Sequence, residues 1–569
     1  MCTFIEKDFF NKYKNKIVLC CFIFLNAVKL VYFNYSLSIN IEDLPKFIIL
    51  KFLVNIVLVT IIYLILFKFK LRKTAIIFYI LQFVYIFAHM CYFKYFNNYL
   101  HIKQVFMLMK EGITALRHLN LSLNFSVILL IIDIPFFTYL VKKNNIFLSY
   151  DGIFMMIGPI IFIMIAVNDF LFPSTLYTKH FLGYSSENYV VKTYGTFVND
   201  VISIMGNYND DEIIKKFRYG KEIKNVNKDG DNSSIIILQL ESIDSNIINE
   251  KYNGKYIAPY LHYLTTQSVY YPYTMSYHEG GGTSDAEFSI LNSIEPLQSD
   301  IAMKLRTYSY PNSVIKQFRK NGYSCRAFHG NDERFYNRGS AFHEMQFDEF
   351  YDIDKMNLHH VGWGAPDKEV LDFTIDMNKC DSKPFLSYII SMTSHTSFKV
   401  VYNYYINHDY DNVKDELTKD YYNSVSYVDD VLKDYIYTIR NMVPNAYIFI
   451  LGDHTPPIED GKYLKSAVKY DEKYFEFVPL FILTPDNKIY QEKSKVASFL
   501  DIAPTILNAS GIEYEYKTDG DDLLNFDNVN SKIPYKGGMY KRTELFNIIK
   551  NTNWNIDNII KIWKSYWQS

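Results

Sequence analysis

The sequence is poor in cysteine and carries almost no net charge. Six cysteines occur in 569 residues, too few and too irregularly spaced for a disulfide framework. Only Cys325 and Cys380 lie in the less apolar part of the chain, and either a disulfide or two free buried thiols fits them. The 59 basic and 61 acidic residues give a net charge of −2, so the excess of base that indicates a nucleic-acid partner is missing.

Long apolar stretches fill the chain up to residue 173, and a chain of this length is too long for one ordinary domain. A membrane-spanning helix needs about 20 apolar residues. Five in succession predict an N-terminal five-helix transmembrane bundle over 1–173, and disfavour both buried core helices and a cleaved signal peptide. Asp133 and Pro135 interrupt the fourth stretch. The five predicted spans are roughly 17–37, 47–67, 74–93, 124–141 and 153–172.

Lysine and arginine in the short loops predict the orientation of these spans. They gather before the first span, after the second and after the fourth, which all lie on one side of the membrane if the five spans are present. The N-terminus is therefore predicted to be cytoplasmic, and everything after residue 173 extracytoplasmic, in a multi-pass protein of the cell membrane. The segment 94–123 also faces outward, either as a helix on the membrane surface or as an ordinary connecting helix.

After a predicted linker at 174–230, with short helices at 197–205 and 210–218, short apolar runs alternate with longer helical patterns. This alternation predicts an α/β domain over 231–525, with a mainly parallel sheet sandwiched by helices, followed by a C-terminal extension at 526–569. The predicted buried strands are 234–240, 323–328, 385–392, 446–451 and 478–483. The predicted helices are 258–268, 284–292, 312–321, 366–378 and 420–441.

Four of the predicted strands end in acidic or imidazole side chains: Glu241, His329, His395, and the pair Asp453-His454. Because the carboxyl ends of parallel strands share one edge, where ligands bind, these side chains should lie together. A single histidine is more often structural, but four such coincidences at one edge favour a site. Carboxylate and imidazole ligands suit Mn²⁺, Mg²⁺ or Zn²⁺.

Three glycines precede Thr283 in the run GGGTSDAEF at 280–288. Ser284 and Glu287 fit a capping box, so a helix should begin here with Thr283 just before its N-terminus, where backbone amides favour anions such as phosphate. A cation would lower the pKa of the Thr283 hydroxyl and make it a usable nucleophile. The alternative is a glycine-rich turn in which Thr283 only caps the helix. The presence of the candidate metal ligands in the same sequence favours the interpretation of Thr283 as a nucleophile.

Together these motifs resemble the lipoteichoic acid synthase family of the sulfatase/alkaline phosphatase-like superfamily. The resemblance covers the predicted anchor and about residues 230–525. It is carried by Glu241, Gly281-Gly282-Thr283-Ser-Asp-Ala-Glu-Phe, Phe328-His329-Gly330, Gly362-Trp363-Gly364, Thr393-Ser394-His395, Gly452-Asp453-His454 and Leu500-Asp501-Ile-Ala-Pro504-Thr505.

The resemblance implies one divalent cation, usually Mn²⁺ with Mg²⁺ or Zn²⁺ as alternatives, and a site of named residues. The implied metal ligands are Glu241, Thr283, Asp453 and His454, with Thr283 also the nucleophile, and the implied substrate-binding residues are His395, Arg338, His329, Tyr336 and Asn331. Tyr336 stands where family members tend to have Trp, and Asn331 where they tend to have Asp. Both positions lie near the glycerol group, so the transferred alcohol is less firmly implied than phosphoryl transfer.

The implied reaction moves a glycerophosphate group from phosphatidylglycerol, through a glycerophospho-threonine, to a hydroxyl acceptor on a glycolipid-anchored chain or a glycan. Four alternatives stay open. A phosphoethanolamine transferase usually has several disulfides, which the few cysteines disfavour, and a sulfatase needs a Cys/Ser-x-Pro-x-Arg-like motif that Thr283 lacks. A phosphodiesterase would use water as the acceptor, and a non-catalytic relative would only bind glycerophosphate.

Overall fold

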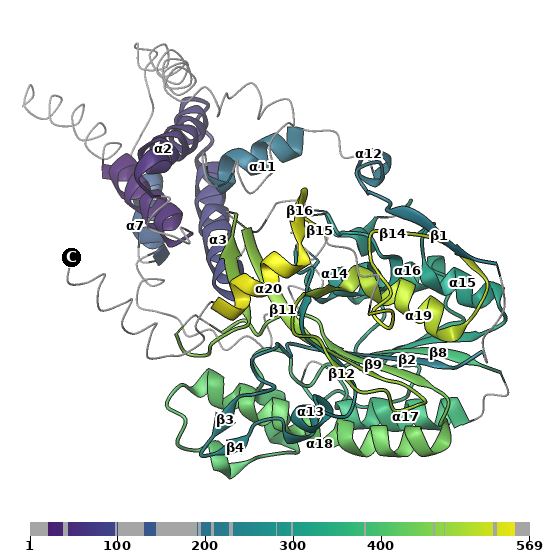
Figure 1. The fold of residues 1–569 in the computed structure, drawn as a ribbon. Coiled ribbons are helices and arrows are strands. Elements are labelled where there is room, and N and C mark those ends of the chain that lie inside the picture. Colours follow the sequence, from purple (N-terminus) through teal and green to yellow (C-terminus); the bar gives the residue numbers. More distant parts are fainter. Residues whose placement is uncertain are drawn as a thin grey trace, which may run out of the picture. The chain divides into compact units, whose positions relative to one another are not determined.

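The computed structural model divides into two compact units, one with the described residues up to Met205 and one with those from Asp210 onward (Figure 1). The structure describes residues 21–37, 44–96, 100, 130–131, 133–143, 191, 195–205, 210–226, 232–279, 281–297, 300–305, 307–362, 364–379, 383–458, 461–471, 473–526 and 532–551.

The described part of the first unit is helical. It contains a helix over 21–36, α2 (Leu44–Lys68), α3 (Arg72–Phe96), α7 (Asp133–Lys143) and α11 (Thr196–Met205). Within the described residues, one stretch, Arg72–Cys91, is long and apolar enough to cross a membrane, and Val54–Phe67 is a shorter apolar helix. The five-span bundle therefore remains a prediction. The fifth predicted span and most of 94–123 lie outside the described residues.

Asp133, which interrupts the fourth apolar stretch, has partners within this unit. Its carboxylate lies 2.5 Å from Lys29 Nζ and accepts a hydrogen bond of 2.6 Å from the Tyr79 hydroxyl. These partners come from two other helices, so the ion pair and the hydrogen bond together join three helices of the unit. A charged side chain among apolar helices is costly unless it is paired in this way.

The second unit is built on a ten-stranded sheet that contains all five predicted strands. At its centre β9 (Tyr447–Gly452), β2 (Ile235–Leu240), β8 (Phe385–Ile390) and β6 (Ser324–His329) run parallel to one another, because helices return the chain to the same end of the sheet. Eight strands follow in the order β12 (Tyr490–Gln491), β5 (Val269–Met275), β11 (Lys473–Leu483), β9, β2, β8, β6 and β7 (Glu349–Tyr351).

The sheet is mainly parallel, as predicted, but one strand departs from this pattern and makes the sheet mixed. Strand β11 runs antiparallel to both β9 and β5. Between β9 and β11 the described chain holds only β10 (Ala467–Tyr470), which pairs with β11 as a hairpin. Without a crossover helix, β11 returns antiparallel to β9. The short strand β13 (Ala497–Ser498) pairs in parallel with β5.

Helices cover both faces of the sheet, as predicted (Figure 1). On one face lie α13 (Pro259–Leu264), α17 (Asp367–Lys379) and α18 (Glu416–Met442). On the other lie α14 (Thr283–Asn292), α15 (Val314–Lys320), α16 (Arg338–Glu344) and α19 (Ile502–Ser510). All six residues of β2 and of β8 are buried, so the apolar runs of the sequence form the core between these layers.

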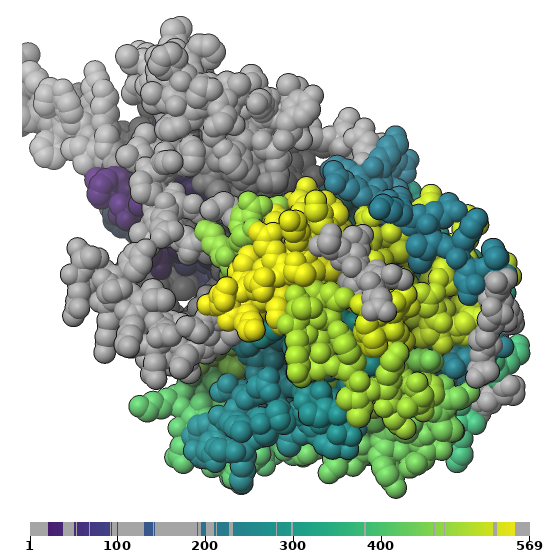
Figure 2. Space-filling view, viewed as in Figure 1, coloured from purple at the N-terminus to yellow at the C-terminus, as the bar shows by residue number. Residues whose placement is uncertain are grey.

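Segments on both sides of 231–525 pack with this unit. Strand β1 (Lys221–Asn225) pairs antiparallel with β14 (Tyr514–Thr518), β15 (Lys532–Tyr535) forms a hairpin with β16 (Gly538–Lys541), and α20 (Arg542–Asn551) follows. Figure 2 shows these last residues in yellow on the face in view. At the start of α20, Arg542 donates two hydrogen bonds of 2.8 Å to Asp501, and both side chains are buried. Other short elements are α12 (Asp210–Ile214), β3 (Lys251–Tyr252), β4 (Lys255–Tyr256) and several 3-10 helices.

Replacing Gly452 with alanine should lower the free energy of unfolding by about 3 kcal/mol, because overpacking forces the backbone apart. A Cβ atom at this last residue of β9 would lie 1.8 Å from the carbonyl oxygen of Ile243, which is backbone and does not give way. Gly254→Ala is the control: its Cβ would meet nothing within 4 Å at φ +80°, so only backbone strain of about 1 kcal/mol is expected. Chemical denaturation followed by circular dichroism measures the free energy of unfolding of both variants. Equal losses of stability in Gly452→Ala and Gly254→Ala would contradict the prediction.

Candidate active site

Two acidic side chains meet where β2 and β9 end. The two strands are parallel neighbours with Leu240 opposite Gly452, so Glu241 and Asp453 follow at the same edge of the sheet. The Asp453 amide donates to the Leu240 carbonyl at 3.1 Å, which extends the ladder by one residue. Both carboxylates are buried. The predicted meeting of these strand ends is therefore confirmed.

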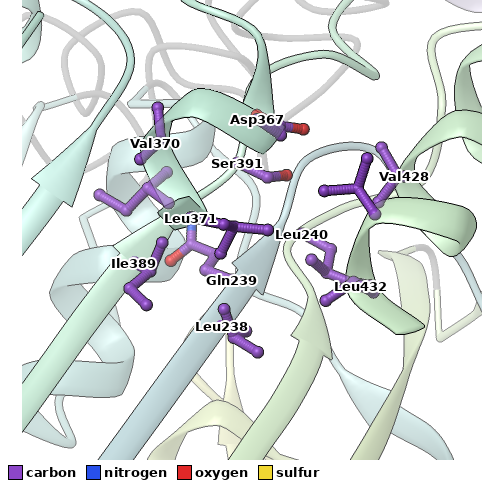
Figure 3. Close-up of a pocket in the computed structure, with 12 residues that line it drawn as sticks. Leu238, Gln239, Leu240, Asp367, Val370, Leu371, Ile389, Ser391, Val428 and Leu432 are labelled. Carbon is purple, nitrogen blue, oxygen red and sulfur yellow. The ribbon is translucent and has the colours of Figure 1, made fainter. Parts of the chain in front are cut away.

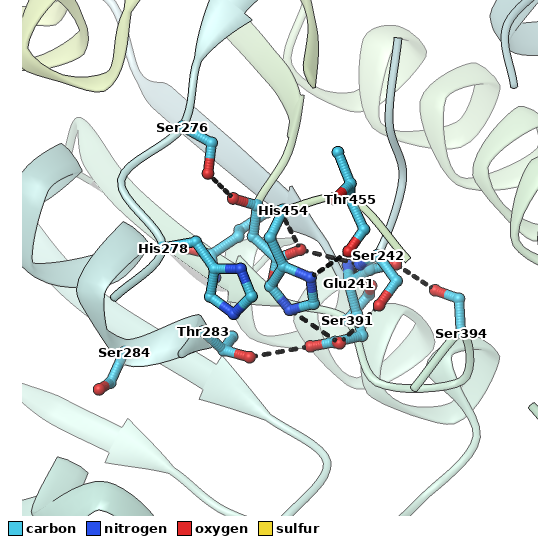
Figure 4. A network of polar contacts seen from close by, with 12 residues as sticks. Glu241, Ser242, Ser276, His278, Thr283, Ser284, Ser391, Ser394, His454 and Thr455 are labelled. Carbon is cyan, nitrogen blue, oxygen red and sulfur yellow. Dashed lines mark hydrogen bonds and ion pairs between the residues drawn. The ribbon is translucent and has the colours of Figure 1, made fainter. Parts of the chain in front are cut away.

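His454 completes a group of three side chains whose ligand atoms all lie within 4.8 Å of one another (Figure 4). Its Nε2 lies 3.3 Å from Glu241 Oε1 and 3.7 Å from Asp453 Oδ2. Its Nδ1 hydrogen-bonds the Thr455 carbonyl at 3.0 Å. This bond keeps the proton on Nδ1 and presents Nε2 to the carboxylates, the arrangement usual for a histidine that binds a metal.

Thr283 reaches the same group from a different part of the chain. Its hydroxyl donates a hydrogen bond of 3.1 Å to Glu241 Oε2 (Figure 4). The structure thus brings together Thr283, Glu241, Asp453 and His454, the four residues that the sequence singled out as metal ligands.

The bonding of Asp453 shows that these residues fit a cation. Its Oδ1 accepts the backbone amides of Ser242 at 2.8 Å and of His454 at 2.7 Å. Its Oδ2 is buried and accepts no hydrogen bond within the described residues. A buried carboxylate oxygen without a donor is rare, and a bound cation would satisfy it. Two carboxylates, a hydroxyl and an imidazole suit Mn²⁺, Mg²⁺ or Zn²⁺.

The buried charged groups of the site shift one another's pKa values. Burial alone would raise the pKa of Glu241, but the nearby His454 holds it well below its usual range. Burial and the charge of Glu241 raise the pKa of Asp453 well above its usual value. Burial opposes the charging of His454, but Asp453 and Glu241 raise its pKa. The two buried carboxylates therefore disfavour each other's charge, and a bound cation would relieve this repulsion.

The loop before Thr283 differs from the predicted capping box. Helix α14 begins at Thr283 itself, after Gly282 at φ 56° and ψ −133°, and no side chain caps it. Asp285 Oδ2 instead accepts the amides of Glu279 at 3.0 Å and Gly281 at 2.8 Å. Glu287 does not reach back to the helix start, because its carboxylate is buried against Arg338.

Arg338, a predicted substrate-binding residue, is held by Glu287 in a buried ion pair. Its Nε lies 3.0 Å from both carboxylate oxygens, and its Nη2 lies 2.6 Å from Oε1. The guanidinium carbon lies 5.4 Å from the centre of the Tyr336 ring. A Cβ atom placed on Gly282 would lie 3.1 Å from the Tyr336 hydroxyl, so Tyr336 lies over the loop that carries Thr283.

The other predicted substrate residues lie at strand ends or in the loops that follow them. His329 ends β6, and its Nδ1 hydrogen-bonds the Ile390 carbonyl at 3.1 Å. Burial and the charge of Arg338 lower the pKa of His329 to about 3, so its ring is neutral at pH 7. His395 Nδ1 hydrogen-bonds the Thr396 carbonyl at 2.7 Å. Asn331 Oδ1 accepts the Asp332 amide at 2.8 Å. Substrate binding by these residues stays a prediction.

Sequence reasoning missed two residues beside the site. The His278 ring stacks on His454, with centroids 4.3 Å apart and planes at 13° (Figure 4). Its Nδ1 donates to Glu476 Oε2 at 3.2 Å, and the same oxygen accepts the Thr455 amide at 3.2 Å. His278 follows β5, a strand that was not predicted, and Glu476 lies in the part of β11 before the predicted start. The position of His278, five residues before Thr283, was the only available signal.

An enclosed space between the sheet and helices α17 and α18 is not part of this site (Figure 3). Leucine, isoleucine and valine side chains form most of its lining, and the space of about 10 Å³ is that of a single water molecule. Its one carboxylate, Asp367, accepts the backbone amides of Met392 at 2.6 Å and Thr393 at 3.1 Å. Asp367 therefore holds the loop after β8 in place.

Comparisons with known proteins agree with the resemblance that the motifs predicted. Residues 233–512 match the sulfatase family model. The lipoteichoic acid synthase-like protein YvgJ of Bacillus subtilis (strain 168) is 28% identical over 311 residues, 52% of this chain and 50% of that protein. Lipoteichoic acid synthase 2 of the same strain is 25% identical over 515 residues, 83% of this chain and 77% of that protein. The match to the first of these spans only half of that relative's length.

A solved structure extends the likeness of fold. It is the integral membrane protein lipooligosaccharide phosphoethanolamine transferase A of Neisseria meningitidis, with a TM-score of 0.52 at 11% identity, covering 86% of this chain and 95% of that one. At this identity the likeness concerns the fold alone. Residues 233–512 thus match the sulfatase family, and lipoteichoic acid synthases are among the proteins to which the chain is similar.

Proposed function

We propose that the protein transfers a glycerophosphate group from phosphatidylglycerol to a hydroxyl acceptor, with Thr283 as the nucleophile. The observation that carries this proposal is the hydrogen bond of 3.1 Å from the Thr283 hydroxyl to Glu241, beside Asp453 and His454. It supports the proposal because it joins a nucleophile to a set of metal ligands at the start of a helix. The similarity to lipoteichoic acid synthases supports glycerophosphate as the transferred group.

The proposed reaction has two displacements at one phosphorus. Thr283 Oγ1 forms a bond to phosphorus, the bond from phosphorus to the diacylglycerol oxygen breaks, and diacylglycerol leaves with a proton. A hydroxyl of the acceptor then attacks the same phosphorus and gives up its proton, and Thr283 is released as a hydroxyl. Splitting the reaction in this way replaces one high barrier with two lower ones.

The residues around Thr283 have distinct proposed tasks. Glu241, Asp453 and His454 would hold the cation, most simply Mn²⁺, whose charge favours the deprotonated Thr283 oxygen and the charge on the phosphoryl oxygens. Glu241 Oε2 also orients the Thr283 hydroxyl through the observed hydrogen bond. His395 would hold a phosphate oxygen or assist proton movement, and the neutral ring of His329 would lie in the same pocket.

Arg338 is proposed to bind the phosphate, and its observed contacts select the nitrogen that would do so. Glu287 occupies Nε and Nη2. Nη1 makes only a long hydrogen bond of 3.5 Å to the Phe335 carbonyl. A phosphate oxygen would therefore meet Nη1, while the buried Glu287 keeps the guanidinium from turning away. Tyr336 and Asn331 are proposed to lie beside the glycerol.

The donor is a membrane lipid, so the proposed function fits the predicted multi-pass anchor and an extracytoplasmic domain. The acceptor is proposed to be a glycolipid-anchored polymer or an envelope glycan. The family name of the domain does not imply sulfate-ester hydrolysis here, because Thr283 lacks the Cys/Ser-x-Pro-x-Arg-like context. Among the described residues of the second unit, the one cysteine, Cys325, is a buried free thiol, which gives no support to the disulfide-rich alternative.

The purified full-length chain, incubated with fluorescent phosphatidylglycerol and Mn²⁺, should release diacylglycerol, and it should not release it from phosphatidylethanolamine. The reason is that the implied pocket residues bind glycerol and phosphate, and no acidic group is proposed there to bind an ammonium. Thin-layer chromatography of the labelled product measures both reactions, and a parallel sample with a chelator in place of Mn²⁺ is the control. Release from phosphatidylethanolamine alone would instead identify a phosphoethanolamine transferase.

A further inference from the structure

The turn of the C-terminal hairpin meets the loop that leads to Thr283. Lys536, between β15 and β16, places its Nζ 2.7 Å from Glu279 Oε1, and its backbone amide donates to Glu295. Two residues earlier, the Pro534 carbonyl accepts a hydrogen bond of 2.7 Å from the Tyr277 hydroxyl. The hairpin therefore contacts this loop at both Tyr277 and Glu279.

Glu279 is linked directly to the start of helix α14. The Glu279 and Gly281 amides both donate to Asp285 Oδ2, at 3.0 and 2.8 Å. Gly281 and Gly282 have no side chains with which to anchor the loop, and glycine leaves the backbone unusually free. The position of Thr283 therefore depends on contacts that other segments make with its neighbours. Glu279 is the neighbour that the ion pair with the C-terminal hairpin holds.

The pair between Lys536 and Glu279 is partly buried, with side chains 24% and 6% exposed. Burial opposes the charging of Lys536, but the carboxylate of Glu279 raises its pKa above the ordinary value, so the ammonium stays charged. Screening by water and salt is weak at such a site, and an ion pair there holds its geometry better than one at the surface. Lys532, on the same hairpin, is exposed and makes no such contact in the described structure.

We propose that Lys536, acting through Glu279, positions the nucleophile loop, so that the C-terminal hairpin is part of the transfer machinery. Lys536 is thus a positioning residue: it touches neither the predicted metal ligands nor the proposed substrate residues. The proposal rests on the proposed function, since the positioned group is the Thr283 nucleophile. It also places a needed residue beyond 512, where the match to the family model ends.

Four variants of the full-length chain test the proposal: Lys536→Met, Lys536→Arg, Glu279→Gln and the control Lys532→Met. Because a small misplacement of a reacting group is costly, Lys536→Met and Glu279→Gln should lower kcat for diacylglycerol release by about tenfold or more. KM for phosphatidylglycerol should stay unchanged. Lys536→Met leaves the buried Glu279 carboxylate unpaired and should lower the midpoint of thermal unfolding more than Glu279→Gln does, but both variants should remain folded at the assay temperature. Lys536→Arg keeps the charge and should retain most of the activity, and Lys532→Met should behave as the wild type.

Hydrogen exchange at the peptide 277–285 gives a readout that does not depend on turnover. Lys536→Met should speed exchange of the Gly281 amide several-fold, and Lys532→Met should not. The proposal would be overturned if the peptide 277–285 of Lys536→Met exchanged as slowly as that of the wild type. It would also be overturned if Lys536→Met had the kcat of the wild type. If the wild type itself releases no diacylglycerol from phosphatidylglycerol, the proposed function fails, and the exchange data alone then decide whether Lys536 holds the loop.

Discussion

Replacing Thr283 with alanine should abolish diacylglycerol release, with a loss of about a thousandfold or more, because no other hydroxyl can replace a covalent nucleophile. The side chain is half-buried and makes one hydrogen bond, to Glu241, so the midpoint of thermal unfolding should hardly change. Thr283→Ser keeps the hydroxyl and should retain measurable turnover. The rate at which fluorescent diacylglycerol is released measures the turnover of the wild type and of both variants.

Mass spectrometry gives a second test of the same residue. When phosphatidylglycerol is supplied without an acceptor, the wild-type peptide with Thr283 should gain the mass of a glycerophosphate group, and the alanine variant should not. Equal turnover by Thr283→Ala would exclude Thr283 as the nucleophile. The site would then be a metal centre that activates water or the acceptor directly.

Asp453→Asn should have opposite effects on stability with and without metal. Without metal, the wild type buries Asp453 Oδ2, which accepts no hydrogen bond in the described structure and lies near the charge of Glu241. The neutral variant should therefore be more stable by about 1–2 kcal/mol. With Mn²⁺ at a hundred times its Kd, the wild type should gain about 2.7 kcal/mol. The variant should gain little, because it lacks a ligand. Activity should fall below detection.

Thermal unfolding in chelator and in Mn²⁺, across a range of pH, checks this prediction. The raised pKa of Asp453 means that the folded protein binds this proton more tightly than the unfolded chain does. In chelator, wild-type stability should therefore fall as the pH rises from the ordinary carboxyl pKa through the raised value, and Asp453→Asn should lose this dependence. An equal gain from Mn²⁺ in both proteins would show that Asp453 is not a ligand.

The predictable part of the fold came from runs of apolar residues. The five strands and five helices predicted in the second unit are all present, because strands buried on both faces must be apolar throughout. The direction of β11 was not predictable, since an apolar run carries no sign of its direction. Strand β5 was missed because Pro272 interrupts its pattern.

Part of the candidate site could likewise be predicted from the sequence, and part could not. Glu241 directly follows one predicted strand, and Asp453 and His454 follow the end of another after Gly452, so their meeting could be inferred from the sequence. The buried pair of Glu287 with Arg338 could not, because Glu287 also fits a local capping pattern, and only the tertiary contact shows which partner it takes. Lys536 lies far along the chain from Glu279, in a segment with no pattern that indicates its contact.

The buried pair of Asp501 and Arg542 has a consequence for protein synthesis. The two residues are 41 positions apart, and Asp501 leaves the ribosome first. Burial of a carboxylate that has no cation costs several kcal/mol, so a nascent chain cannot close around Asp501 until Arg542 has emerged. A product of premature termination just before Arg542 would contain every predicted metal ligand and Thr283, but would stay open to proteases. Cells would therefore accumulate complete molecules and clear shortened ones.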